Sequence, residues 1–161
     1  MSKTVHTVNI RLKGLKGYSL KRAWLKETIL SVLAAEKHAG QLEIDCLVTN
    51  DPNIQVLNRK YRGIDEPTDV LSFALDEAGP AGTVFPGPPG PAAGMGILVV
   101  SYPTAIAQAA RNNVTAEEEL RLLLVHGVLH ILGYDHIGRA DALVMRRRER
   151  EIIGILRKKQ P

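Results

Sequence analysis

Three of the chain's five histidines lie within one stretch of eleven residues, HGVLHILGYDH, at positions 126–136. His126 and His130 are four residues apart, so on a helix their rings project from the same face, about one turn apart. Gly133 can then end this helix in the left-handed conformation. The chain can turn back there, so that His136 approaches the same point. The stretch therefore predicts a helix and a following glycine turn that bring three imidazoles together.

Three converging imidazoles are a typical site for a transition metal ion. Three neutral histidines leave one position of a tetrahedral zinc ion open, which is the pattern of catalytic rather than structural zinc. A water molecule in that position can be hydroxide near neutral pH. We predict one Zn²⁺ ion held by His126, His130 and His136, although imidazole also suits nickel, copper and iron. The alternative is that the three histidines are unrelated surface or core residues.

Gly127 bears on the reaction that such a metal would catalyse. The spacing H-x-x-x-H-x-x-G-x-x-H is that of metzincin zinc proteases, which carry a glutamate general base where this chain has Gly127. Peptide hydrolysis needs that base to deprotonate water and to protonate the leaving amine. In phosphodiester cleavage the metal can polarise a phosphoryl oxygen, and an arginine can stabilise the developing charge. The pattern therefore favours a phosphodiester substrate.

Short apolar and alternating segments predict four strands, over residues 8–12, 42–48, 69–75 and 96–101. The last of these, GILVVS, is continuously apolar and is expected to be a central strand. In LEIDCLV the alternation places Cys46 on a buried face, so we interpret this residue as part of the core rather than as a reactive thiol.

Segments with helical periodicity predict five helices, over residues 20–38, 52–61, 103–112, 116–132 and 139–158. Ser19 is the expected N-cap of the first helix. Thr115 and Glu118 form a capping box at the start of the fourth. This order of elements predicts an α+β fold: a small, four-stranded mixed sheet flanked by about five helices.

A chain of 161 residues has the size of one ordinary domain. Residues 76–94 contain five glycines and five prolines, which predicts a loop within a single domain that covers residues 1–161. The sequence has no apolar run of the roughly 18 residues that a membrane span needs. It also has no secretory signal segment and a single cysteine. These features predict a cytoplasmic protein without a membrane partner.

Basic residues are concentrated at both ends of the chain. Residues 1–30 carry seven Lys or Arg against Glu27 alone, and residues 146–159 carry seven against two acids. The region between them, residues 31–145, has fourteen acids and seven bases. This distribution suggests a polyanionic partner such as nucleic acid. The alternative is a solvated helix face whose C-terminal bases match the helix dipole.

The stretch HGVLHILGYDH closely resembles the signature H-G-x-L-H-L-x-G-Y-D-H of the YbeY family, metal-dependent endoribonucleases of ribosomal RNA maturation. A second block, NRKYRGIDEPTDVLSF at residues 58–73, resembles the segment N-x-x-Y-R-x-x-D-x-P-T-D-V-L-S-F of the same family. Together the two motifs cover less than a fifth of the chain, and the order of the remaining elements also fits. The eleven-residue motif is highly specific for the family.

The resemblance implies a single α+β domain with a zinc site at His126, His130 and His136. It also implies a single-strand-specific endoribonuclease that acts in small-subunit (16S) rRNA 3′-end maturation and ribosome quality control. Ribosomal RNA and the small ribosomal subunit would be the partners of the protein. The important arginine of the family matches Arg62, which would bind substrate phosphate near the metal and take part in catalysis with the water activated at His126. The alternative for Arg62 is a surface salt bridge with Asp65 or Glu66.

Several residues near the motifs keep two interpretations. Asp69 could orient a histidine through its second ring nitrogen or cap a turn, and Asp135 has the same ambiguity. Tyr134 is expected to pack rather than to react. The family usually has an acid in the segment before its fourth strand, where this chain has Ile97, so an acid's role at that point is in doubt.

Two other functions remain open from the sequence. The absent general base allows a ribosome-assembly factor whose metal mainly shapes the fold. A metallopeptidase would have to recruit its base from elsewhere, for example from Glu66 or Asp69. RNA cleavage with and without the metal distinguishes the assembly factor from an endoribonuclease. Digestion of a peptide library tests the metallopeptidase.

Overall fold

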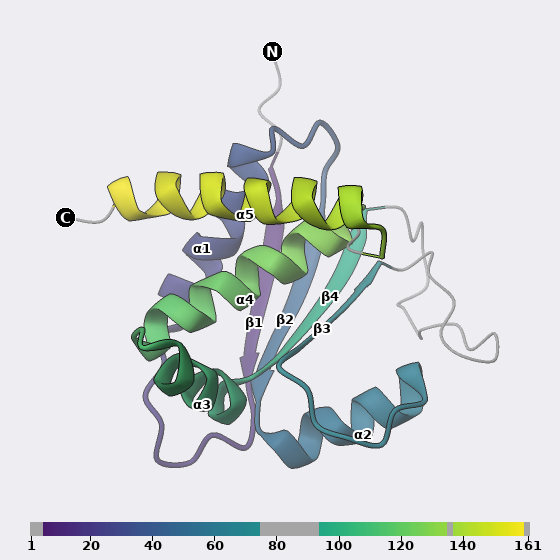
Figure 1. The fold of residues 1–161 in the computed structure, drawn as a ribbon, viewed down its shortest axis with the longest axis vertical. Helices are drawn as coiled ribbons and strands as arrows, with labels where there is room; N and C mark the ends of the chain where they lie inside the picture. Colours follow the sequence, from purple (N-terminus) through teal and green to yellow (C-terminus); the bar gives the residue numbers. More distant parts are fainter. Residues whose placement is uncertain (1–4, 75–93, 135–136, 160–161) are drawn as a thin grey trace.

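A mixed sheet forms the centre of the computed structural model, which describes residues 5–74, 94–134 and 137–159. Its strands are β1 (Thr7–Leu12), β2 (Glu43–Thr49), β3 (Val70–Ala74) and β4 (Met95–Ser101). They lie in the order β1-β2-β4-β3, in which β1, β2 and β4 are parallel and β3 is antiparallel to β4 (Figure 1). The predicted four-stranded mixed sheet is confirmed, and the apolar strand β4 is an inner strand, as expected.

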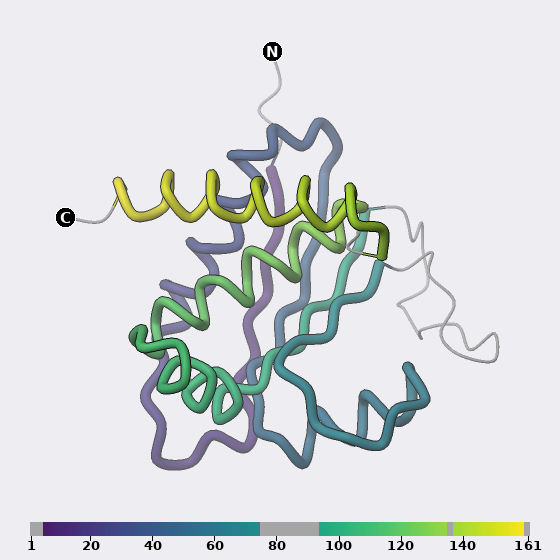
Figure 2. The backbone as a smooth tube through the Cα atoms, in the orientation of Figure 1, coloured from purple at the N-terminus to yellow at the C-terminus, as the bar shows by residue number. Residues whose placement is uncertain are grey.

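Five helices surround this sheet within the described residues, as predicted. They are α1 (Arg22–Ala35), α2 (Asp51–Arg62), α3 (Tyr102–Asn112), α4 (Ala116–Ile131) and α5 (Arg139–Lys158). Helix α4 runs diagonally across the sheet, and α5 turns back over it (Figures 1 and 2). Nine of the sixteen residues of α4 are buried, because this helix packs against α1, α3, α5, β3 and β4. The helix with the histidines is thus the central helix of the fold.

The two faces of the sheet are covered by different helices. Leu98 and Val100 of β4 belong to a large apolar cluster that includes residues of α1, α3, α4 and α5. Val99 points to the opposite face, where it packs with Ile54 and Tyr61 of α2. This separation follows from the alternation of side chains along a strand. Because α2 covers the second face, its C-terminal end reaches the edge strand β3, where Tyr61 contacts Phe73 edge to face.

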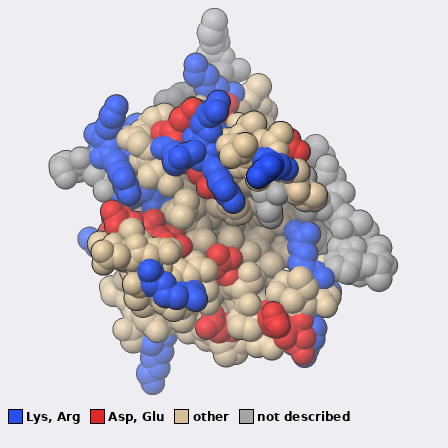
Figure 3. All heavy atoms as spheres, in the orientation of Figure 1, with Lys and Arg blue, Asp and Glu red and all other residues tan. Residues whose placement is uncertain are grey.

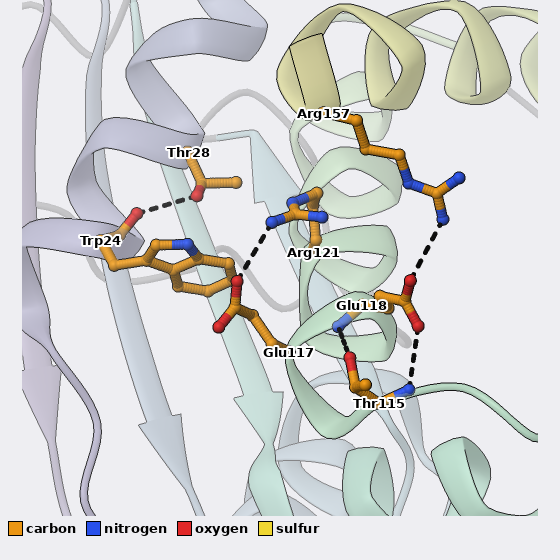
Figure 4. A network of polar contacts seen from close by, with 7 residues as sticks. All are labelled: Trp24, Thr28, Thr115, Glu117, Glu118, Arg121 and Arg157. Carbon is orange, nitrogen blue, oxygen red and sulfur yellow. Dashed lines mark hydrogen bonds and ion pairs between the residues drawn. The ribbon is translucent and has the colours of Figure 1, made fainter. Parts of the chain in front are cut away.

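The N-terminal end of α4 is fixed by polar contacts that the sequence predicted in part. Thr115 and Glu118 form the capping box, in which each side chain accepts a hydrogen bond from the other residue's backbone N–H (Figure 4). The bond from the Thr115 N–H holds the pKa of Glu118 below its ordinary value. Glu118 also pairs with Arg157 of α5 at 3.6 Å. This ion pair joins the C-terminal end of α5 to the start of α4.

Arg121 is a buried cation on the same helix. Its Nη2 lies 3.2 Å from Oε1 of Glu117, and its guanidinium lies 5.7 Å from the ring centroid of Trp24 on α1 (Figure 4). A buried charge is tolerated where it is paired and hydrogen-bonded in this way. The contact between Arg121 and Trp24 connects α4 to α1.

Ser19 does not cap α1, so that prediction was wrong. The N-cap is Lys21, which makes no side-chain cap hydrogen bond. Leu20 packs against the large apolar cluster before the helix begins, and this burial places the start of the helix after Lys21.

Cys46 is buried, as predicted. Across the described residues, every helix falls short of the length or apolarity that a bilayer crossing requires. Apart from Gly94, the predicted loop at 76–94 lies outside the described residues.

Candidate metal and phosphate site

A cleft of about 690 Å³ opens where β3, the C-terminal half of α4 and the turn after α4 meet. It brings together three of the predicted site residues, Arg62, His126 and His130, which are up to 68 positions apart in the sequence. The remaining lining residues come from β3 and the residue before it, and from the chain between α4 and α5: Asp69, Val70, Leu71, Ser72, Gly133, Tyr134 and Ile137. The cleft therefore combines imidazoles and a guanidinium, which are the groups that bind a metal ion and a phosphate.

His126 and His130 project from the same face of α4, as their spacing predicted. Their ring centroids are 4.7 Å apart and their planes are inclined at 71°. Both side chains are half-buried. The third predicted ligand, His136, and its neighbour Asp135 lie outside the described residues. The described residues by themselves contain no group of three candidate ligands.

Glu149 on α5 contacts the first of these histidines from outside the cleft. Its Oε1 lies 2.5 Å from Nδ1 of His126, and the glutamate is buried. Metal-binding histidines usually have a carboxylate or carbonyl on the second ring nitrogen, which fixes the tautomer and the ring orientation. With Nδ1 held by Glu149, Nε2 is the nitrogen of His126 suited to a metal ion.

Glu149 was not predicted as a site residue, although the sequence contains a signal for it. Met145, Ile152 and Leu156 form the buried stripe of α5, and Glu149 occupies a position in the same stripe. A carboxylate is rarely buried without a partner. A charged residue among the apolar positions of an amphipathic helix could therefore have been flagged as half of a buried pair.

The turn after α4 is held by a network that reaches α1. Gly133 has a positive φ of 103°, and the N–H of Tyr134 donates to the carbonyl of Leu129 at 3.0 Å. The hydroxyl of Tyr134 donates to Oε2 of Glu36 at 2.8 Å. Burial, followed by this hydrogen bond, raises the pKa of Tyr134. Tyr134 thus has a positioning contact, in line with the expectation that it packs rather than reacts.

Glu36 is itself fixed by Arg148 of α5. The Nε of Arg148 pairs with Oε1 of Glu36, and its Nη2 donates to the carbonyl of Ala35 at 2.9 Å. The hydrogen bond that Arg148 donates to Glu36, followed by the one it donates to Glu151, raises the pKa of Arg148. Helices α1 and α5 therefore both contribute to the position of the turn that follows His130.

Arg62 reaches the cleft from the last turn of α2. Gly63 ends the helix in the left-handed conformation, with a φ of 72°. The guanidinium lies 4.7 Å from the ring centroid of Phe73, and Nη2 donates to the carbonyl of Ser72 at 2.8 Å. Among the described residues, Asp65 forms its ion pair with Arg59, whose Nη1 lies 3.9 Å from Oδ1 of Asp65. Arg62 is thus directed along β3 toward the cleft.

The carboxylate of Asp69 accepts hydrogen bonds from its neighbours in the chain, among them Val70, and from Gln108 of α3. Its Oδ1 accepts a hydrogen bond from the N–H of Val70 at 2.7 Å, and its Oδ2 accepts one from Nε2 of Gln108 at 3.1 Å. The backbone carbonyl of Asp69 accepts from the N–H of Ser101. Of the two interpretations of Asp69, the structure favours the turn-capping one, and Glu149 takes the place beside His126.

Gly127 allows a close approach between α4 and the sheet. A Cβ at this position would overlap Cδ1 of Leu98 and would lie 3.3 Å from Cγ2 of Val70. Position 127 is buried and faces β3 and β4 rather than the cleft. A glutamate could not enter here without moving the helix away from the sheet, so the base of a metzincin has no equivalent at this position.

Ile97 stands where the family resemblance led us to expect an acid. It lies on β4 in register with Phe73 of β3, and packs partly buried against the α2-side cluster. An apolar side chain suits this environment. Ile97 is not among the residues that line the cleft.

Comparison with known proteins places the chain among nucleases. The family model described as "Endoribonuclease YbeY" matches residues 15–157. A protein of that name from Moorella thermoacetica is 43% identical over 130 residues, which cover 81% of this chain and 83% of the relative. One from a Roseiflexus species is 40% identical and covers 97% and 96%.

A similar fold is known from a protein of Thermotoga maritima whose structure was determined in solution. It has a TM-score of 0.56 and 26% sequence identity to this chain, and the match covers 94% of this chain and 93% of that one. The family match, the identities and the shared fold agree over most of the chain. The chain belongs to the YbeY family of endoribonucleases, enzymes that hydrolyse phosphodiester bonds in RNA.

Proposed function

We propose that this protein is a zinc-dependent, single-strand-specific endoribonuclease that matures the 3′ end of small-subunit rRNA and acts in ribosome quality control. The observation that carries the proposal is that His126, His130 and Arg62 line one cleft. Imidazoles supply ligands for a metal ion, and a guanidinium supplies a planar fork for a phosphate. The ligands of the proposed metal ion and the proposed phosphate-binding group thus line the same cleft.

His126, His130 and His136 are the residues that would hold the metal. When bound, a zinc ion supplies a water of lowered pKa and a Lewis acid for a phosphoryl oxygen. The chemistry of the described donors fits such an ion: two imidazoles lie on one helix face, and one of them has a carboxylate behind it. Glu149 acts as a positioning residue, because it holds His126 in one ring orientation.

Arg62 would bind the scissile phosphate and stabilise the charge that develops on it. Its stacking on Phe73 and its hydrogen bond to the Ser72 carbonyl orient the side chain. An arginine held in advance loses less conformational freedom when the phosphate binds. We expect a single strand rather than a duplex to enter the cleft, because an unpaired backbone is free to place one phosphate between the two groups.

RNA digestion with and without metal tests this proposal. Protein loaded with Zn²⁺ should cut a single-stranded RNA and spare a duplex, and a chelator or His126→Ala should stop the cutting. His38→Ala is the matched control, because His38 pairs with His6 outside the cleft and should leave the activity unchanged. Equal cutting by wild type and His126→Ala would reject the proposed metal site.

The ribosomal partner and the cytoplasmic location are tested in cells. We expect the protein to co-sediment with the small ribosomal subunit in a cytoplasmic extract. We also expect depleted cells to accumulate small-subunit rRNA with an unprocessed 3′ end. If depletion left that end unchanged while the purified protein still cut RNA, the substrate would be a different RNA.

A further inference from the structure

One exposed face of α5 carries four arginines, Arg139, Arg146, Arg147 and Arg150, which we call the arginine face. Their spacing of seven, eight and eleven residues from the first places them on one side of a helix. All four are exposed, and the buried residues of α5, among them Met145 and Glu149, lie on the opposite side. In Figure 3, several Lys and Arg side chains lie on the surface over α5, with acidic and uncharged residues between them.

The arginine face differs from the other arginines of the same helix in its partners. Arg148 is paired with Glu36 and Glu151, and Arg157 is paired with Glu118. No ion pair or hydrogen bond connects the four guanidinium groups of the arginine face to another of the described residues. The paired arginines join α5 to α1 and α4, whereas the arginine face has no such structural role.

The arrangement is also unfavourable for the helix itself. Arg146 and Arg150 are like charges at i and i+4, which repel each other. Arg139 stands in the first turn, where the helix dipole disfavours a cation. An ordinary solvated face would mix both signs of charge. An external polyanion would relieve these repulsions.

The arginine face begins at the mouth of the cleft. Ile137 lines the cleft, Gly138 is the N-cap of α5, and Arg139 is the first residue of the helix. At 1.5 Å per residue, Arg139 to Arg150 span about 16 Å along the helix axis. The exposed side chain of Leu143 lies between Arg139 and Arg146, where a base could rest on it. A strand leaving the cleft on this side would therefore pass along the arginine face.

We propose that the arginine face of α5 binds the phosphate backbone of the RNA substrate outside the cleft. This inference rests on the proposed function, since it extends the path of the RNA that the cleft cuts. The face would hold the strand without reading its sequence, because phosphate contacts position a nucleic acid and do not specify it. Arg62 would act at the scissile phosphate, and the arginine face at phosphates several nucleotides away.

Binding of a labelled single-stranded RNA oligonucleotide, measured without metal and in the presence of chelator, tests the proposal directly. Each lost phosphate contact should lower the slope of log K against log salt by about 0.7. For Arg146→Gln/Arg150→Gln we expect the slope to fall by about 1.4 and Kd to rise about 20-fold at roughly 0.1 M salt. With metal present, KM for cleavage should rise with Kd.

Two control pairs separate a local effect from a general one. Lys13→Gln/Lys16→Gln removes the same charge from exposed positions after β1, at the end of the sheet away from α5 (Figure 1), and should change Kd less than threefold. Arg146→Lys/Arg150→Lys keeps the charge and should keep most of the affinity. Circular dichroism and thermal melting of each pair establish that α5 is folded.

The outcomes distinguish this inference from the proposed function. If wild type binds RNA and the arginine pair weakens binding as expected, but no protein cuts RNA, the proposed function fails and the arginine face stands. If wild type cuts RNA and both glutamine pairs bind like wild type, or weaken binding equally, the arginine face is rejected. If the arginine pair leaves RNA binding unchanged but abolishes binding of an acidic protein partner, the arginine face belongs to that partner and the proposal is overturned. Failure of wild type to bind RNA at low salt would overturn it as well.

Discussion

Glu149 on α5 and His126 on α4 meet through Oε1 and Nδ1 at a distance of 2.5 Å. The two residues belong to helices that run back over each other, and the glutamate is buried beneath α5. A buried carboxylate is stable only with a partner, and an imidazole held at one nitrogen presents the other in a fixed direction. The pair therefore connects the packing of α5 to the geometry of the cleft.

Replacement of Glu149 should weaken metal binding more than it weakens the fold. Glu149→Gln keeps the shape of the side chain and removes its charge, so we expect the Kd for Zn²⁺ to rise about 10- to 100-fold. Competition with a chromogenic chelator measures this without any cleavage assay. Glu151→Gln is the matched control on the exposed side of α5 and should leave the affinity unchanged. An unaltered affinity of Glu149→Gln would mean that the contact only packs the two helices.

Arg62 should affect catalysis with little effect on stability. Arg62→Gln should lower kcat about 100- to 1,000-fold, because a preorganised donor to the developing charge is lost. Arg62→Lys should recover little of the activity, because an ammonium group lacks the planar fork. Arg59→Gln, which breaks only an exposed pair with Asp65, should cut RNA at the wild-type rate. Single-turnover kinetics at saturating RNA measures the difference, and comparable kcat values for Arg62→Gln and Arg59→Gln would contradict it.

The close approach at Gly127 should make a single added methyl group costly. We expect Gly127→Ala to lower the free energy of unfolding by about 1–3 kcal/mol, because its Cβ would overlap Leu98. In urea denaturation, Gly127→Ala/Leu98→Ala should be more stable than the sum of the two single changes predicts, by about 1 kcal/mol.

The matched control for Gly127 is Gly154 on α5. A Cβ at position 154 would meet no atom within 4 Å. Gly154→Ala should therefore stabilise the protein by about 0.5–1 kcal/mol, since alanine is the better helix former. Destabilisation by Gly154→Ala, or an additive effect in the Gly127 and Leu98 pair, would show that steric overlap is not the cause.

Cys46 should be inert toward thiol reagents in the folded protein. Burial raises the pKa of its thiol to about 12. Labelling at about pH 8 should therefore follow the rate of unfolding and should accelerate with urea. A folded pKa above the unfolded value of about 8.5 favours the native state below pH 8.5, and this contribution is lost as the pH rises from about 9 to 12. Fast labelling without denaturant would place the thiol at the surface.

Local sequence patterns were sufficient for most of the fold. The predicted strand at 42–48 is β2 (Glu43–Thr49), and the predicted helix at 139–158 has the bounds of α5. Alternation and helical periodicity record which side of an element is buried, so they survive in the sequence. The capping box of α4 was predicted because both of its bonds join residues three positions apart. The failure at Ser19 has the opposite cause, since the burial of Leu20 depends on residues far along the chain.

The candidate site was predictable only in its local part. The pair His126 and His130 follows from helix geometry, and Arg62 was assigned by resemblance. Glu149 and Glu36 were not found, because their partners are 23 and 98 positions away and are set by how α5 and α1 dock. Contacts of this kind have no spacing of their own in the sequence. For this reason Asp69, a carboxylate within the second family motif, was considered for the position that Glu149 occupies.

The bond from Tyr134 to Glu36 means that the histidine motif cannot be transplanted by itself. A short peptide that copies HGVLHILGYDH would carry every imidazole but neither of the two carboxylates that anchor the motif from distant helices. Grafted onto a foreign scaffold, it would bind ions loosely and with changing geometry. The portable unit is α4, its turn and the two helices α1 and α5 that dock on them.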